Sequence, residues 1–227
     1  MLINGIEVQI TRKFVKHLRL GIHPPDGRVR ITAPWFVTNT QIKRLLVSKL
    51  SWIEEKQAAF RLRPPATVQA FVSGETHYVQ GQAHQLKIID STSRARVFIE
   101  EPATLVMAVP ATTSQSEREA ILNAWYRCEL KKRIAPFIDK WESTMQVQVL
   151  EWRIKKMKTR WGTCNAQARR IWLSLELAKK SDACLEYVVV HEMVHFFERH
   201  HNDRFKALMD GFLPGWRIDK NALNGSC

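Results

Sequence analysis

Four of the chain's eight histidines and two glutamates lie in the segment "VVVHEMVHFFERHHN" (residues 188–202), near the carboxyl end of the chain. His191 and His195 are four residues apart, so on an α-helix their imidazoles lie on one face, one turn apart. Two nitrogens at that spacing can bind one zinc ion. Glu192 projects roughly 100° around the helix from His191, where a carboxylate can take a proton from metal-activated water. The spacing therefore predicts a hydrolytic zinc site with Glu192 as its general base.

A catalytic zinc site needs a third protein ligand and one open coordination position. His201 follows His191 by ten residues, as in known three-histidine zinc sites, so we expect it to be the third ligand, with His200 as the alternative. The metzincin motif has glycine three residues after its second histidine, where this chain has Glu198. The alternatives to a catalytic site are core histidines with hydrogen-bond partners and a structural zinc. Structural zinc sites usually use four ligands rich in cysteine, and no cysteine here has suitable spacing.

The composition bounds the class of protein and its partners. The chain has 227 residues, of which 45% are hydrophobic and 25% charged, which is typical of a globular protein. It has no apolar segment of signal-peptide or membrane-span length, and its four cysteines are scattered. We therefore predict a cytoplasmic protein with reduced thiols and no membrane partner. A net charge of +13 favours nucleotide or nucleic acid partners at a basic surface, although an inert basic surface explains the charge equally well.

The order of elements predicts an α+β fold. Residues 1–112 are expected to form an antiparallel, β-rich region with one helix near residues 40–61, which a Thr38–Gln41 capping box begins. Residues 113–227 are expected to form the domain that carries "HEMVH". Its expected helices begin at Ser114, at Ser181 or Asp182, and near Asn202. The segment "RLRPPAT" (61–67) reads as a linker, and no internal repeat is evident.

Three further motifs carry a resemblance to a known family: "MKTRWGTC" (157–164), "YVVVHEMVHFFERHH" (187–201) and "FLPGW" (212–216). With them the chain resembles the YgjP-like zinc metallopeptidases, relatives of the SprT-like and WLM group. The resemblance implies a zincin-like catalytic domain with zinc on His191, His195 and His201, and with Glu192 as base. The chain departs from the family pattern twice. It has His200-His201-Asn202 where the family usually has Asn-His-Ser, and Gly215 where the family often has aspartate.

The segment "RWGTC" is placed to form a strand above the metal, where zincins pair with extended substrate. Arg160 would then either stabilise a developing oxyanion or form an ion pair with an acidic residue. Trp161 is expected to pack in the core, and Gly162 to permit a close approach of two chain segments. All three are candidate substrate-binding residues. A basic run from Glu151 to Arg170, with seven Lys and Arg residues including Lys158, surrounds them.

These features predict a zinc-dependent hydrolase, most simply a metallopeptidase with a peptide or protein substrate. Two other functions are carried forward. Some YgjP-like proteins are described as nucleoside-triphosphate (UTP) pyrophosphatases, and the basic run could neutralise a triphosphate. SprT-like relatives act near DNA, so a DNA-associated protease is the third hypothesis, with salt-dependent DNA binding as its signature.

Overall fold

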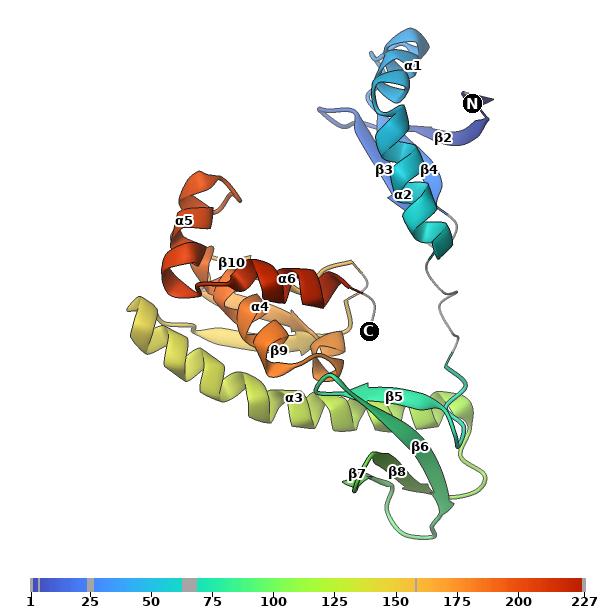
Figure 1. Ribbon diagram of the computed structural model, residues 1–227, viewed down its shortest axis with the longest axis vertical. Coiled ribbons are helices and arrows are strands. Elements are labelled where there is room, and N and C mark those ends of the chain that lie inside the picture. Colours follow the sequence, from blue (N-terminus) through green and yellow to red (C-terminus); the bar gives the residue numbers. More distant parts are fainter. Residues whose placement is uncertain (1, 4, 24–26, 63–68, 158, 226–227) are drawn as a thin grey trace. The chain divides into compact units, whose positions relative to one another are not determined.

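The computed structural model describes residues 2–3, 5–23, 27–62, 69–157 and 159–225. The chain divides into two compact units, Met1–Val68 and Gln69–Cys227 (Figure 1). Six α-helices and three small sheets in these residues make the fold α+β, as predicted. Within the described ranges, no helix combines the length and hydrophobicity that crossing a membrane requires. Lys158 of the predicted basic run, residues 63–67 of the predicted linker and Cys227 lie outside the described residues.

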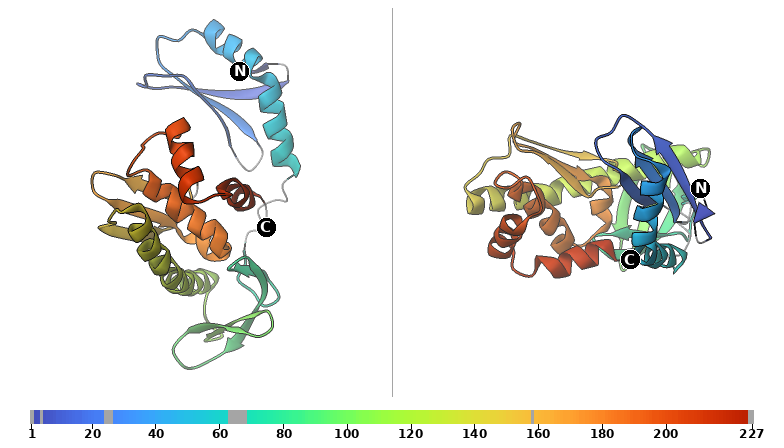
Figure 2. Two further views of the ribbon diagram at one scale, coloured as in Figure 1. Left: turned by 60° about the vertical axis from the view of Figure 1, so that its left-hand side comes forward. Right: turned by 90° about the horizontal axis from the view of Figure 1, so that it is seen from above.

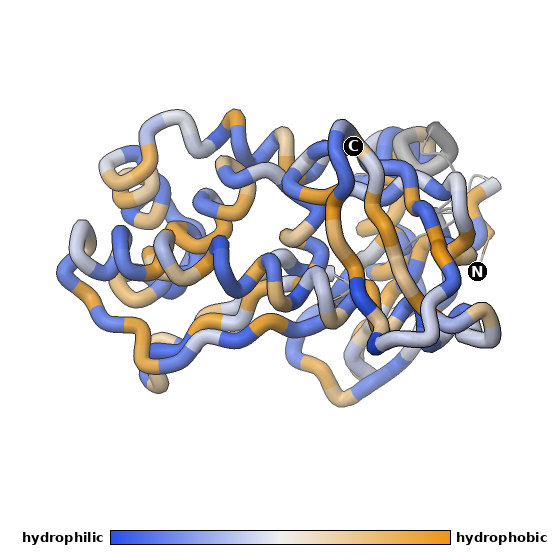
Figure 3. The backbone as a smooth tube through the Cα atoms, turned by 90° about the horizontal axis from the view of Figure 1, so that it is seen from below, coloured by the Kyte–Doolittle hydropathy of each residue, from blue (hydrophilic) through white to orange (hydrophobic). Residues whose placement is uncertain are grey.

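The first unit is a four-stranded sheet with two helices. Its elements are β1 (Leu2–Ile3), β2 (Ile6–Arg12), β3 (Arg19–His23), β4 (Arg28–Ala33), α1 (Asn39–Ser48) and α2 (Leu50–Leu62). The strand order is β1-β2-β4-β3, with β2 and β4 parallel. Alternate residues of β4 are buried, and they share a core with Ile42, Leu46 and Ile53 of the helices. Hydrophobic and hydrophilic residues alternate in the same way along several strands in Figure 3.

The helix predicted near residues 40–61 is divided into two helices, α1 and α2. The prediction of a single continuous helix was therefore wrong. The predicted capping box is present, with the Thr38 and Gln41 side chains each accepting from the other residue's backbone N–H. α1 ends where the Ser48 hydroxyl donates to the Leu45 carbonyl, a local bond that competes with helical hydrogen bonding. Lys49 then leaves the helical conformation, and α2 begins at Leu50.

The second unit begins with another four-stranded sheet. It contains β5 (Thr76–Val79), β6 (Gln82–Asp90), β7 (Arg96–Glu100) and β8 (Thr104–Val109) in the order β5-β6-β8-β7, followed by the long helix α3 (Gln115–Met145). α3 begins after Ser114, as predicted, with a capping box between Ser114 and Glu117, and Pro136 lies inside the helix. β6 and β8 are parallel, and β7 is antiparallel to β8.

The two four-stranded sheets are a structural repeat that the sequence did not reveal. Each starts with a hairpin that turns through a glycine with positive φ, and each pairs its second and fourth strands in parallel. β2, β4 and α1 each begin 76 residues before their counterparts β6, β8 and α3. Pro34 and Pro110, and the caps Thr38 and Ser114, keep the same spacing. Few other side chains match, which explains why the repeat was not evident.

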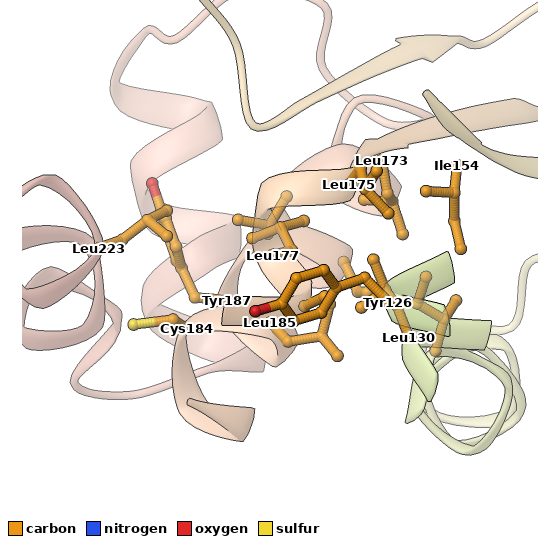
Figure 4. Close-up of a cluster of buried hydrophobic side chains, with 14 of the residues drawn as sticks. Tyr126, Leu130, Ile154, Leu173, Leu175, Leu177, Cys184, Leu185, Tyr187 and Leu223 are labelled. Atoms are coloured by element: carbon orange, nitrogen blue, oxygen red, sulfur yellow. The ribbon is translucent and has the colours of Figure 1, made fainter. Parts of the chain in front are cut away.

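The remainder of the second unit is a three-stranded sheet with four helical segments. The strands β9 (Glu151–Lys155), β10 (Gly162–Asn165) and β11 (Arg170–Ser174) lie in the order β10-β11-β9, so β10 is an edge strand. The 3-10 helix η1 (Leu175–Lys179) and the helices α4 (Asp182–Val194), α5 (Asp203–Phe212) and α6 (Trp216–Asn224) follow. α3 and α4 pack side by side, and Leu130 of α3 shares a core with Leu177 of η1 and Leu185 of α4 (Figures 2 and 4).

The boundary predicted between residues 112 and 113 lies inside the second unit. Leu86 and Leu105 of the β5–β8 sheet belong to the same hydrophobic core as α3 and α4, so this sheet is part of the larger compact unit. The division between compact units falls instead between Val68 and Gln69, directly after the predicted linker. The assignment of the catalytic role to residues 113–227 stays a prediction.

Candidate metal centre

α4 carries the first two histidines through the interior of the second unit. The Ser181 side chain accepts a hydrogen bond from the Cys184 backbone and so begins the helix, as predicted. The helix contacts α3, α5, α6, β10 and β11, which explains why it is apolar on nearly every face before His191. His191 lies in the last turn and His195 is the C-cap, so both imidazoles emerge at the end of a rigid, buried element.

The three histidines predicted as ligands converge on one point. Nε2 of His201 lies 3.0 Å from Nε2 of His191 and 3.2 Å from Nε2 of His195. The ligand atoms of the three side chains all lie within 4.8 Å of one another. Two nitrogens bound to one tetrahedral zinc ion are separated by about 3.3 Å, given zinc–nitrogen bonds near 2.0–2.1 Å. The donor set and its spacing therefore fit a zinc ion.

The surroundings of His191 and His195 favour metal binding through Nε2. Burial lowers the pKa of His191 to about 3, with further lowering from the charges of His195, His201 and Lys220. Nδ1 of His195 lies 3.0 Å from the Glu198 carbonyl oxygen, and Nδ1 of His191 lies 3.5 Å from the Tyr187 hydroxyl. When Nδ1 is engaged in this way, the neutral ring presents Nε2 to the metal.

The turn after α4 brings His201, and not His200, into the cluster. Glu198 occupies the position of the metzincin glycine without backbone strain, because residues 195–202 contain no positive φ angle. The Glu198 side chain accepts a hydrogen bond from the His200 backbone N–H, which stabilises the turn. Asn202 then caps α5 by accepting from the Phe205 backbone, as predicted. The chain reverses through these local hydrogen bonds and needs no glycine.

An aromatic ring that the sequence analysis missed supports the three imidazoles. Phe205 is buried, and its ring centroid lies 4.9 Å from those of His191 and His195 and 4.7 Å from that of His201. Tyr187 both stacks on Trp216 and approaches His191 through its hydroxyl. The Asn202 cap determines where α5 begins and therefore that Phe205 faces the interior. The local sequence does not show which side chains the Phe205 ring contacts, because those contacts depend on the tertiary fold.

Glu192 is buried beside the histidines, with 5% of its surface exposed. A β-carbon on Gly162 would lie 2.6 Å from the Glu192 Oε1 atom, so β10 approaches this carboxylate more closely than any side chain at position 162 would allow. This is the close approach that we predicted for Gly162. Burial raises the pKa of Glu192 to about 8, and the positive charge of Arg160 opposes that rise. A bound cation would likewise favour the carboxylate form.

A cleft of about 960 Å³ contains all the predicted site residues. Its lining includes the three histidines and Glu192, together with Arg160, Trp161 and Gly162 at the start of β10. The ion pairs among the described residues include none with Arg160, which does not support the ion-pair role. Trp161 packs against the core while also lining the cleft. Arg199 is a second cleft cation that the sequence analysis did not single out.

One comparison with known proteins identifies a family for the chain. The profile of the family described as YgjP-like, metallopeptidase domain, matches residues 16–226, nearly the whole chain. The crystal structure of the metallopeptidase zymogen of Pyrococcus abyssi abylysin has a TM-score of 0.37 and 15% sequence identity. That likeness covers 40% of this chain and 90% of the zymogen chain, and it is too weak to carry an argument. No curated protein matches the chain.

Proposed function

The chain belongs to the YgjP-like metallopeptidase family, and we propose that it is a zinc-dependent peptidase in which Glu192 is the general base. One observation carries the proposal: three imidazole nitrogens converge beside a buried carboxylate in a large cleft. The ligands in this proposal are His191, His195 and His201. Three ligands leave one tetrahedral position for water or substrate, which distinguishes a catalytic site from a structural one.

The residues of the site have separate tasks in peptide hydrolysis. A zinc ion held by the three histidines supplies positive charge, which lowers the pKa of water and polarises a carbonyl group. Glu192 accepts the proton of the attacking water and later donates it to the leaving amine. Its burial keeps the carboxylate away from bulk water and Gly162 limits its movement, so the proton acceptor stays in one position.

The edge strand β10 supports a peptide substrate. One side of β10 pairs with β11, and the strand order leaves its other side unpaired in the sheet. An extended peptide can add to such an edge through backbone hydrogen bonds, with Gly162 close to the histidines. Arg160 lies two residues before this strand and lines the cleft, and its charge acts on Glu192. In this proposal Arg160 stabilises the negative charge that develops on the attacked carbonyl oxygen.

The variant Glu192→Gln tests the proposal. It keeps the shape of the side chain but removes the proton acceptor, so we expect hydrolysis of an unfolded protein such as casein to fall by about 10²–10⁴-fold. Bound zinc, measured by elemental analysis, should remain. His191→Ala should lose both zinc and activity, whereas Glu129→Gln on α3 should lose neither. Full activity of Glu192→Gln would exclude Glu192 as the base.

The cations of the cleft favour a second candidate, hydrolysis of a nucleoside triphosphate such as UTP. Arg160 and Arg199 line the cleft, and phosphate groups bind well to arginine. Pyrophosphate release from a panel of nucleotides, measured beside casein cleavage, shows which reaction the protein catalyses. His191→Ala should abolish either reaction, because both need the zinc ion. If only nucleotides are hydrolysed, the zinc site stands and the peptidase assignment fails.

A further inference from the structure

The first unit presents a group of aromatic and basic side chains at one end of its sheet. β2 and β4 are parallel, and Arg12 pairs with Ala33, so both strands end at the same edge. β3 is antiparallel to β4 and starts there, because Arg19 pairs with Thr32. The segments 13–18 and 34–38 therefore leave the sheet side by side. Arg12 joins them through hydrogen bonds from its guanidinium to the carbonyls of Pro34 and Val37.

Three large rings at this edge are largely exposed to solvent. The exposed fraction is 98% for Phe14, 61% for Trp35 and 78% for Phe36. Three exposed basic residues lie near Phe14 in sequence: Lys13, Lys16 and Arg19. We call these six residues the aromatic-basic edge. Scattered exposed hydrophobic residues are ordinary, but three rings from two adjoining segments form a patch that the fold leaves without an internal partner.

The structural repeat shows that the fold does not require these rings. Positions 76 residues after Phe14, Trp35 and Phe36 are Asp90, Ala111 and Thr112. Both copies keep the proline and the helix cap next to these positions, and both form the same sheet edge. The second copy therefore forms the same edge with small or polar side chains, whereas only the first copy has aromatic ones. A requirement of the fold cannot explain a feature that only one of two equivalent edges has.

The charge of the first unit identifies the class of partner. Residues 1–68 contain 12 Lys and Arg against 4 Asp and Glu, a net charge of +8 out of the +13 of the whole chain. No acidic residue occurs in 8–25 or in 27–53. The positive charge is thus concentrated in the unit that does not contain the three histidines, and it complements a polyanion.

We propose that the aromatic-basic edge binds single-stranded nucleic acid. A single strand offers phosphates together with bases whose faces are free to stack, and this edge combines exposed cations with exposed rings. A bilayer surface is the competing polyanion. Insertion into a bilayer favours an unbroken apolar tip with cations behind it, whereas here Lys13 and Lys16 flank Phe14 in sequence and expose their side chains beside it. The binding needs no metal and is independent of the peptidase proposal.

The test measures binding of fluorescein-labelled oligothymidylate to the full chain by fluorescence anisotropy. The triple variant Phe14→Ala, Trp35→Ala, Phe36→Thr removes the rings and introduces at two positions the residues of the second copy. We expect its affinity to fall at least about ten-fold, since each stacked base contributes on the order of that factor. Lys13→Ala, Lys16→Ala, Arg19→Ala should reduce the slope of log affinity against log salt by about 2, or about 0.7 per lost cation.

Two controls match these variants. Leu150→Ala with Ile218→Ala removes exposed hydrophobic residues of the second unit, and Lys56→Ala removes one positive charge from α2. Both should bind oligothymidylate like the wild type, apart from a small loss for Lys56→Ala. Phe14→Ala alone changes a side chain that is almost wholly exposed, so a loss of oligothymidylate binding in this variant would not result from misfolding.

Unchanged oligonucleotide binding by the triple ring variant would overturn the proposal. Ring-dependent binding to phosphatidylserine vesicles without oligonucleotide binding would also overturn it and would identify a membrane surface.

Discussion

A methyl group at position 162 would collide with the carboxylate of Glu192, so Gly162→Ala must displace either the strand or the base. With the β-carbon 2.6 Å from Oε1, we expect activity to fall by about 10²-fold and stability by about 1–3 kcal/mol. Zinc content should stay unchanged. Gly211→Ala on α5 is the matched control, because nothing lies within 4 Å of its β-carbon, and it should be active and no less stable. Steady-state kinetics with thermal unfolding of both variants checks this, and wild-type kinetics of Gly162→Ala would contradict it.

The Tyr187 hydroxyl is a second single-residue contact with a measurable role. Tyr187→Phe removes its approach to Nδ1 of His191 but keeps the ring that stacks on Trp216. We expect zinc affinity to fall about ten-fold, as for other groups that orient metal-binding histidines, with little loss of stability. Competition with a chelator measures the affinity. Tyr126→Phe is the control: it removes a hydrogen bond to the Tyr78 carbonyl outside the cleft, so zinc affinity should not change. Equal zinc affinity in both variants would exclude the orienting role.

At the scale of elements, the start of α5 determines where His201 lies. Asn202→Ala removes the side chain that accepts from the Phe205 backbone, and the loss of such a cap costs about 1 kcal/mol. Since His201 directly precedes the cap and Phe205 supports all three rings, we expect weaker zinc binding as well. Ser114→Ala removes the cap of α3, outside the cleft, at a similar cost in stability. Calorimetry measures the stability of both variants and zinc titration measures their zinc affinity. Unchanged zinc affinity in Asn202→Ala would refute the proposed dependence of the His201 position on the α5 cap.

The elements differ in how far their sequences predicted them. The caps at Thr38, Ser114, Ser181 and Asn202 were confirmed, because a cap depends on residues within one turn of each other. The convergence of the three histidines also agrees with the prediction, since helix periodicity and one local turn bring them together. The contacts of Phe205 and the cation Arg199 were not predicted, because they arise between segments that only the tertiary fold brings together.

At the scale of the whole molecule, the repeat changes how the amino-terminal half is understood. The sequence suggested one β-rich region up to residue 112, whereas two copies of one topology are present, and the second belongs to the unit that holds the candidate metal centre. Few side chains match between the two copies, because a sheet end and a helix cap require particular residue types at only a few positions. Topology and spacing are the same in both copies, whereas most surface residues differ. The aromatic-basic edge is on the first copy, which belongs to the unit Met1–Val68.

Zinc should therefore stabilise one unit and leave the other unchanged. A ligand that binds only the folded state adds about 2.7 kcal/mol when its concentration is 100 times its dissociation constant. All three proposed ligands lie in the second unit, so this stabilisation should appear as slower hydrogen exchange in α4 and α5 when zinc replaces a chelator. Exchange in β2 and β4 of the first unit should not change, and His191→Ala should abolish the effect everywhere. Equal protection of both units by zinc would mean that they unfold together, and the description of two independent compact units would then fail.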